Sequence, residues 1–140
     1  MNMTPSKTLV LLFALAALSS CRSGETHHRQ AEGAIGPYSA SVRSGDFHFL
    51  SGKIGEQGVT FAEEAESAIA RVEEELAHSE LTLGDVVSTI VYLTDMGRYE
   101  EFNGIYARRF PAPYPARTCV AVAALPRGAR VEVAVIARGR

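Results

Sequence analysis

Residues 115–137, PARTCVAVAALPRGARVEVAVIA, contain the clearest secondary-structure signal in the chain. Within 117–122 and 131–137 the side chains are mostly β-branched or small and apolar, and the Pro-Arg-Gly sequence between them is typical of a turn. The pattern predicts a strand, a turn and a strand that form the last hairpin. Arg117 and Glu132 are the only charged residues of these two strands. A charge on a buried strand is unfavourable unless a partner or ligand compensates it, so both are candidates for a functional site.

The rest of the chain gives alternating strand and helix signals. Residues 39–42 and 47–50 are predicted to form a hairpin, because turn residues separate two short strand-like runs. A helix is expected over 60–79, where a Thr-x-x-Glu capping box precedes apolar residues at three- and four-residue steps. Residues 86–93 are rich in Val, Ile, Thr and Tyr and suit a central strand. Aromatic residues at helical spacing predict a second helix over 99–110, which prolines terminate.

The predicted order of elements is β-β-α-β-α-β-β, an α/β fold in which both helices pack on one face of a mixed sheet. The other face of the sheet has no cover in this arrangement. Because it carries apolar side chains, it predicts a partner, and another copy of the same chain is the simplest one.

The composition indicates one globular domain without a nucleic-acid partner. The chain has 140 residues, of which 46% are hydrophobic, enough for one core. Its formal net charge of −2 provides no overall basic field for nucleic acid. Seven arginines but only one acid lie between Gly104 and Arg140. We expect only Arg117 among them to bind a small anion, since the others are predicted at helix ends, in the turn or at the terminus.

The first 20 residues have the organisation of an export signal. Lys7 precedes an uninterrupted apolar run over 9–18, which is too short to cross a membrane comfortably. The sequence Leu-Ser-Ser-Cys at 18–21 resembles the lipobox of bacterial lipoproteins, which implies lipidation of Cys21; an ordinary signal peptide is the alternative. We therefore expect an exported, periplasmic protein held to a membrane only by its lipid anchor. Arg22 after the cysteine favours the outer membrane.

Residues 21–33 are polar and have no apolar period, so they are predicted to be a flexible tether, and the folded domain is expected to span 34–140. A histidine pair at 27–28 lies in this segment without further ligands at metal-binding spacing, so no metal site is predicted. If Cys21 is acylated, Cys119 has no cysteine partner and no disulfide is expected.

Six short motifs follow one another in a recognisable order between residues 34 and 138. They are Gly36-Pro37-Tyr38, Ser51-Gly52, Gly84-Asp85-Val86, Asn103 with Tyr106, Pro115-Ala116-Arg117, and the segment from Leu125-Pro126 to Ala137. Together they resemble the RidA/YjgF family of reactive-intermediate deaminases. The resemblance implies a chorismate-mutase-like fold and a homotrimer with its sites in the clefts between subunits. It also implies hydrolysis of 2-imino acids, such as 2-iminopropanoate and 2-iminobutanoate, to 2-oxo acids and ammonia without a cofactor.

The same resemblance implies roles for individual residues. Arg117 would pair with the substrate carboxylate through its planar guanidinium, and Glu132 would hold and help deprotonate the attacking water. The other substrate-binding residues would be Tyr38, Ser51, Gly52, Asn103 and Cys119, the last through its backbone amide and carbonyl.

The sequence departs from the family pattern at one position near the predicted site, and two functions other than deamination are considered. Lys53 stands where the family commonly has glutamine and is expected to add a cation near the mouth of the cleft. A non-catalytic protein that binds small carboxylates in the same clefts is the main alternative to an enzyme. RNA cleavage fits poorly with export and with the acidic charge balance.

Overall fold

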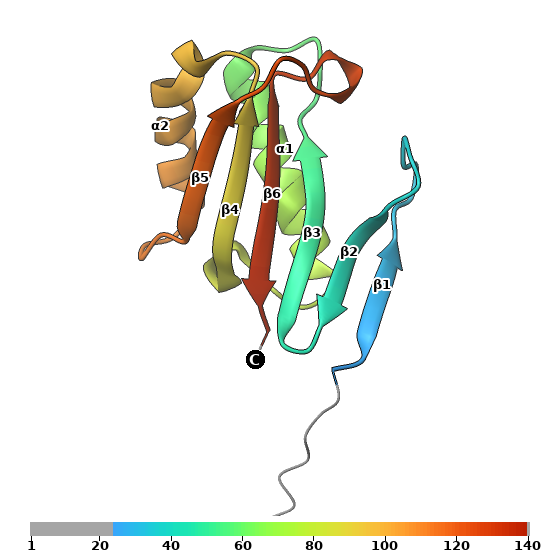
Figure 1. Ribbon diagram of the computed structural model, residues 1–140. Helices are drawn as coiled ribbons and strands as arrows, with labels where there is room; N and C mark the ends of the chain where they lie inside the picture. The colour runs from blue at the N-terminus through green and yellow to red at the C-terminus, as the bar shows by residue number, and fades with distance from the viewer. Residues whose placement is uncertain (1–23, 140) are drawn as a thin grey trace, which may run out of the picture.

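The computed structural model describes residues 24–139, and within them two α-helices pack on a six-stranded sheet (Figure 1). The strands are β1 (Thr26–Gln30), β2 (Ser39–Ser44), β3 (Phe47–Ile54), β4 (Val86–Leu93), β5 (Ala116–Ala121) and β6 (Val131–Arg138). The helices are α1 (Phe61–Ala77) and α2 (Tyr99–Arg109), with short 3-10 turns η1 (Leu83–Asp85), η2 (Met96–Arg98) and η3 (Pro126–Gly128). The expected export signal over 1–20 and the lipidation site Cys21 lie outside the described residues.

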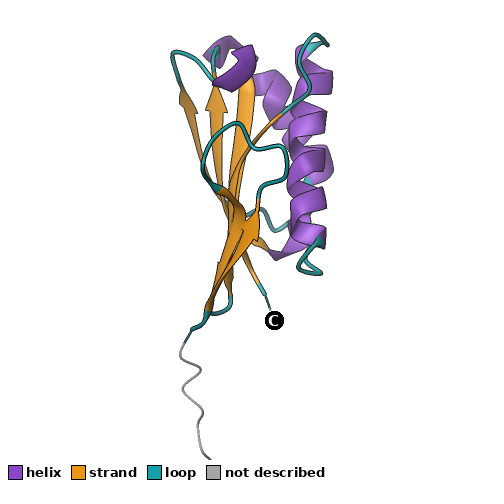
Figure 2. Cartoon of the chain, turned by 90° about the vertical axis from the view of Figure 1, so that its right-hand side faces the viewer, coloured by secondary structure: helices purple, strands orange, loops and turns teal. Residues whose placement is uncertain are grey.

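Both helices lie on one face of the sheet, as expected, and the opposite face is uncovered (Figure 2). The strand order is β1-β2-β3-β6-β4-β5. β6 is antiparallel to both of its neighbours, whereas β4 and β5 are parallel. The crossovers from β3 through α1 to β4 and from β4 through α2 to β5 step in the same direction across the sheet. Crossovers of one hand in one direction place their helices on one face.

The predicted hairpin of the last two strands is wrong. β5 and β6 are consecutive and separated by the expected Pro-Arg-Gly turn, but β4 lies between them in the sheet. β6 alternates between buried apolar residues and partly buried ones and takes a central position with hydrogen-bonded neighbours on both sides. Arg127 in the turn has a positive φ of 56°, which redirects the chain from the sheet edge to its centre.

The predicted flexible tether is also wrong over part of its length. Residues 26–30 form β1, which pairs antiparallel with β2 at the edge of the sheet. Arg29 attaches this strand to α1, because its Nη1 donates to Glu75 Oε2 at 3.0 Å. The strand is therefore stabilised by pairing and by an ion pair rather than by an apolar pattern of its own.

The core lies between the helices and the sheet. The stripe of α1 predicted from its apolar spacing is buried, and so is the inward face of β6 at Val131, Val133 and Val135. Burying each such side chain contributes about 1.5–3 kcal/mol. The predicted capping box is present, with the Thr60 backbone N–H donating to Glu63 and the Glu63 N–H donating to the Thr60 hydroxyl.

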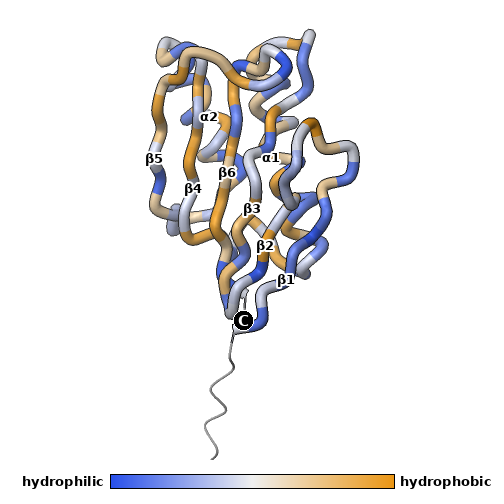
Figure 3. Tube along the Cα trace, turned by 45° about the vertical axis from the view of Figure 1, so that its right-hand side comes forward, coloured by the Kyte–Doolittle hydropathy of each residue, from blue (hydrophilic) through white to orange (hydrophobic). Residues whose placement is uncertain are grey.

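The uncovered face of the sheet carries apolar side chains along several strands. Phe49 on β3 is 44% exposed, and Ile90 on β4 and Val120 on β5 are also exposed. In Figure 3 much of β4 and β6 is coloured as hydrophobic. The face is thus apolar and open in the single chain.

Candidate functional site

Glu132 lies on the uncovered face of the sheet, near the start of β6. Its neighbours in the strand, Val131 and Val133, point into the core, so the alternation of the strand directs Glu132 outward. It is partly buried, and among residues 24–139 its carboxylate has no hydrogen-bond or ion-pair partner. Burial raises the pKa of Glu132 above its ordinary value. A carboxylate with a raised pKa is suited to proton transfer.

A bulge in β3 places Ser51 and Gly52 beside this carboxylate. The pairing of β3 with β6 shifts between Leu50 and Lys53, so that Ser51 and Gly52 together lie opposite the single residue Ala134 and form a bulge with one extra residue. A Cβ atom at Gly52 would overlap with the carboxylate of Glu132, so only glycine permits this approach. The Ser51 hydroxyl donates to the carbonyl oxygen of Ser39 at 2.7 Å, which fixes the bulge against β2.

A cavity of about 500 Å³ opens over these residues. Its lining includes Tyr38, Ser51, Gly52 and Glu132, which we call the Glu132 cluster. Arg127 also lines the cavity, so a cation is present at its wall.

Arg117 lies on β5 and is directed to the opposite face of the sheet, against α2. Its Nη2 donates to Asn103 Oδ1 at 2.7 Å and lies 3.4 Å from the Tyr99 hydroxyl. Its guanidinium carbon lies 4.7 Å from the ring centroid of Tyr106. A guanidinium over an aromatic face and bonded at one edge keeps its other N–H groups in a fixed direction.

Tyr106 is in turn held by a second buried hydroxyl. Thr89 on β4 and the Tyr106 phenol are hydrogen-bonded at 3.0 Å, and both residues are buried. Burial raises the pKa of Tyr106, while the bond to Thr89 and the charge of Arg117 act in the opposite direction. A second cavity of about 270 Å³ is lined by the Arg117 cluster, which comprises Asn103, Tyr106 and Arg117.

Cys119 follows on the same side of β5 as Arg117. Its side chain is partly buried and packs against the core. Burial raises the pKa of its thiol, and the nearby Arg117 only partly counteracts this. A thiol with a raised pKa is a poor nucleophile at neutral pH.

The expected site residues therefore form two groups that one chain does not bring together. Glu132 is level with Tyr92 on β4, and Arg117 is level with Thr89, three residues away along that strand. Their side chains also leave the sheet on opposite faces.

Sequence and structure comparisons place these observations in a family. The model of the family described as Endoribonuclease L-PSP matches residues 28–139. The chain belongs to the RidA/YjgF family. It is 36% identical to the human 2-iminobutanoate/2-iminopropanoate deaminase, with 77% of this chain and 84% of the relative covered. It is 33% identical to the putative reactive intermediate deaminase TdcF of Escherichia coli, over 78% of this chain and 92% of that protein.

Solved structures agree with this assignment. The YEO7 protein of yeast superimposes with a TM-score of 0.77 and 34% identity, covering 83% of this chain and all of that one. E. coli TdcF with bound serine gives a TM-score of 0.72 at 32% identity, covering 77% and 92%. As a RidA/YjgF member, the chain has the fold that its motifs predicted, with β1 in addition.

Several structural contributors to the clusters were not predicted from the sequence. Tyr99 appears in the sequence only as an aromatic residue at helical spacing, and Tyr106 also as a motif residue without an assigned role, yet both contact Arg117. Lys53 lines the Glu132 cavity, but its Nζ donates to Glu75 at 3.2 Å on the helix side. The cation that was expected near the cleft mouth is thus paired with a buried carboxylate.

Residues 24–139 contain no group of three or more His, Cys, Asp or Glu side chains placed to hold a metal ion. No helix in this range combines the length and apolar content needed to cross a membrane.

Proposed function

We propose that this RidA/YjgF protein is a homotrimeric hydrolase that converts 2-imino acids, such as 2-iminopropanoate and 2-iminobutanoate, to 2-oxo acids and ammonia. The observation that carries the proposal is the separation of Arg117 and Glu132 on opposite faces of one sheet. Each cluster holds half of the groups that such a reaction needs. The Arg117 cluster of one subunit would complete the Glu132 cluster of its neighbour.

The uncovered sheet face supports assembly. Phe49, Ile90 and Val120 expose apolar surface there, and an apolar face of this extent is a typical subunit interface. Packing the faces of three copies against one another would bury these side chains. The open edge of each cluster would then face a neighbouring subunit.

Arg117 would bind the substrate carboxylate. Asn103 and Tyr99 occupy one edge of its guanidinium, so the remaining N–H groups are available for a bidentate contact. The aromatic face of Tyr106 below it restricts its rotation. The substrate would therefore enter with its carboxylate fixed and its imine carbon directed toward the neighbour's carboxylate.

Glu132 would activate the water. The water oxygen attacks the electrophilic imine carbon while Glu132 takes a proton from it, and the same proton can return to the nitrogen. The hydroxyl proton of the resulting aminol then passes to the nitrogen, with Glu132 able to relay it, as the C–N bond breaks and the C=O bond forms, so that ammonia and the 2-oxo acid leave. A positioned carboxylate contributes about 10²–10⁴ in rate to such a step. The raised pKa of Glu132 supports this role.

Mixed trimers test the shared site. Arg117→Ala and Glu132→Gln proteins, each inactive alone, are mixed, dissociated and reassembled, and loss of 2-iminopropanoate is followed as semicarbazone formation. If each cleft takes its arginine and its glutamate from different subunits, about a quarter of the clefts regain both groups. Reassembly of either variant alone is the control. Wild-type activity with no recovery in the mixture would refute the shared cleft, and an inactive wild type would refute the deaminase.

We also propose that the chain is exported and anchored through Cys21, on the basis of the apolar run and the lipobox-like sequence before it. Cys21→Ala should release the protein from the membrane fraction, or leave it unprocessed, in the bacterial host. A Ser20→Ala variant is the matched control. Retention of a processed Cys21→Ala protein in the detergent phase would contradict lipidation.

A further inference from the structure

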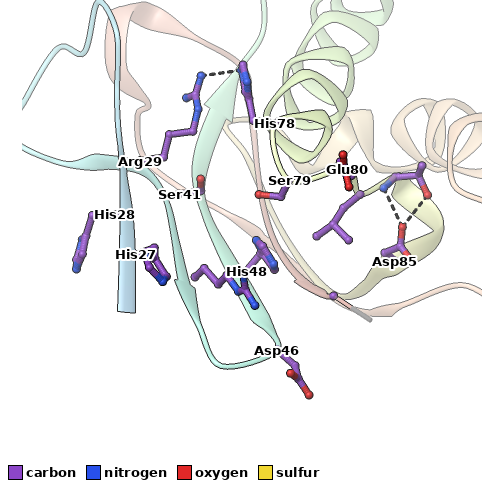
Figure 4. A pocket seen from close by; sticks show the side chains of 14 residues that line it. His27, His28, Arg29, Ser41, Asp46, His48, His78, Ser79, Glu80 and Asp85 are labelled. Atoms are coloured by element: carbon purple, nitrogen blue, oxygen red, sulfur yellow. Dashed lines mark hydrogen bonds between the residues drawn. The ribbon is translucent and has the colours of Figure 1, made fainter. Parts of the chain in front are cut away.

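A further cavity along residues 24–139 belongs to neither cluster and exceeds the cavities of both in volume. It has a volume of about 790 Å³ and lies between β1, β2 and β3 and the C-terminal end of α1 (Figure 4). No residue of the Glu132 or Arg117 cluster lines it. The chain has four histidines, and all four line this cavity: His27, His28, His48 and His78. We call it the histidine pocket.

One wall of the histidine pocket is a row of three basic side chains on adjacent strands. His27 on β1 pairs with Arg43 on β2, which pairs with His48 on β3. Residues that pair directly across antiparallel strands have side chains on the same face. Arg43 is charged, and like charges directly opposite one another destabilise a sheet. Protonation of the neighbouring imidazole of His48 is therefore unfavourable unless an anion compensates the charge.

Arg43 has most of its donors available. Its Nε donates to the Gly45 carbonyl oxygen at 3.1 Å, and neither Nη group has an acceptor among the described residues. The two Nη atoms carry four N–H groups in one plane, a geometry that matches the oxygens of a phosphate or carboxylate.

His48 is the buried member of the row. It is only 8% exposed, lines the pocket, and makes no hydrogen bond to any residue of 24–139. Since the described chain contains no sealed side-chain nitrogen without a partner, the His48 nitrogens open into the pocket. Burial, and secondarily the charge of Arg43, lower the pKa of His48. A bound anion would reverse the effect of Arg43, and His48 could then donate from both nitrogens.

The other charged groups around the pocket are already engaged or lie at its edges. Arg29 donates to Glu75 and to His78, whose Nε2 must accept because arginine has no acceptor. Asp85 accepts from the backbone and hydroxyl of Thr82. The remaining acids are Asp46, which lies 4.0 Å from Arg138 and is directed away from His48 in Figure 4, and Glu80, which is exposed beyond the end of α1. Glu25 lies outside the lining, but its Oε2 is 3.7 Å from His27 Nε2 in a solvent-exposed pair, which an oxyanion bound to His27 would have to displace.

We propose that the histidine pocket binds a small oxyanion, a phosphate or a carboxylate, between the guanidinium of Arg43 and the imidazoles of His27 and His48. The anion would neutralise the row and give the buried imidazole its hydrogen-bond partner. Its binding would strengthen as pH falls, since a protonated His48 imidazole donates from both nitrogens. The site is separate from the imino-acid cleft and does not depend on the deaminase reaction.

Histidine NMR of the whole, tag-free protein tests the proposal, because every imidazole signal reports on this pocket. Inorganic phosphate and pyruvate are titrated separately at constant ionic strength, with chloride as the reference anion. We expect saturable shifts of the His27 and His48 Cε1–Hε1 signals with at least one of the two anions, and tighter binding at pH 6 than at pH 8, roughly tenfold. Saturable shifts with phosphate or with pyruvate show whether the pocket binds a phosphate or a carboxylate.

Three variants make the result specific. Arg43→Gln, at an exposed position, should lower the affinity for the anion roughly tenfold. Arg108→Gln on α2 should leave this affinity unchanged. Arg117→Ala should leave the histidine titration intact, which separates this pocket from the cleft. Linear shifts with both anions, or an unchanged affinity in Arg43→Gln, would overturn the proposal. Shifts produced by zinc chloride but by neither oxyanion would do so as well.

Discussion

The Arg117 and Glu132 clusters differ in how firmly the fold holds their charged group. Arg117 is bonded to Asn103 and packs on Tyr106, which is itself bonded to Thr89. Glu132 has no hydrogen-bond or ion-pair partner along residues 24–139, and only the absence of a side chain at Gly52 makes room for it.

This difference matches the two tasks proposed for them. A group that binds a carboxylate gains from a fixed orientation, because less entropy is lost when the ligand arrives. A group that moves a proton gains from a shifted pKa, which hydrogen bonds to its charged form would lower again. The fold thus fixes the cation and leaves the carboxylate unpaired.

Arg117→Ala should give the largest effect. Without the guanidinium the substrate loses both its carboxylate partner and its orientation, so kcat/KM should fall by about 10⁴ or more. Calorimetry should detect no binding of 2-oxobutanoate. Arg108→Ala is the matched control, and an Arg117→Ala protein that binds 2-oxobutanoate normally would place the carboxylate elsewhere.

Glu132→Gln should separate binding from turnover. The amide keeps the size of the side chain but cannot accept a proton, so kcat should fall about 10³-fold. Affinity for 2-oxobutanoate should change less than twofold, roughly within calorimetric error for a contact that binding does not need. A near-normal kcat would remove Glu132 from the reaction.

Gly52→Ala tests the space beneath Glu132. The added methyl group would displace the carboxylate, whose flexible side chain can rotate, so the fold should survive while kcat falls about 10- to 100-fold. Gly104→Ala serves as a comparison, because this exposed glycine of α2 lies outside both clusters and its added Cβ would lie 3.8 Å from Arg108 Nη1, an ordinary contact. Equal loss of activity and of thermal stability in Gly52→Ala would indicate a folding effect instead.

Asn103→Ala tests the fixed orientation of Arg117. The guanidinium would lose its 2.7 Å bond and keep its aromatic contact, so KM should rise about tenfold with a smaller change in kcat. Asn103→Asp retains an oxygen acceptor for Arg117, so its KM should rise less than that of Asn103→Ala. A KM equal to that of wild type would show that Tyr106 alone orients Arg117.

The smallest expected effect is on the pH dependence of kcat, which should follow the titration of Glu132. Only the deprotonated carboxylate can accept a proton, so kcat should fall as pH decreases through the pKa of Glu132. Because burial raises this pKa above the ordinary value of 4.5, the acid limb should have its midpoint above 4.5. The limb should be absent in the residual activity of Glu132→Gln. A midpoint below 4.5 would contradict the desolvated carboxylate.

The sequence was sufficient for the elements whose stability is local. The capping box at Thr60, the apolar stripe of α1 and the β-branched run of β4 each carry their own signal, and the structure confirms all three. The motifs also predicted the family, which the comparisons confirm.

Features that depend on distant partners were not accessible in this way. β1 has no apolar alternation, and the carboxylate that attaches it lies 46 residues away in α1. The position of β6 in the sheet depends on its pairing with β3 and β4. The turn residues of η3 indicate only where β5 ends and do not specify these partners. The opposite faces of Arg117 and Glu132 follow from packing against α2, which no local spacing reveals.

The position of β1 has a consequence for solubility. Its five residues, Thr-His-His-Arg-Gln, are all polar, and the strand forms one edge of the sheet. An edge strand exposes backbone donors and acceptors that can pair with another extended chain, and polar or charged side chains discourage such pairing. A protein that lacked residues 24–30 would expose β2 as its edge and should aggregate more readily. The polar strand β1 thus limits edge-to-edge pairing of the sheet with other chains.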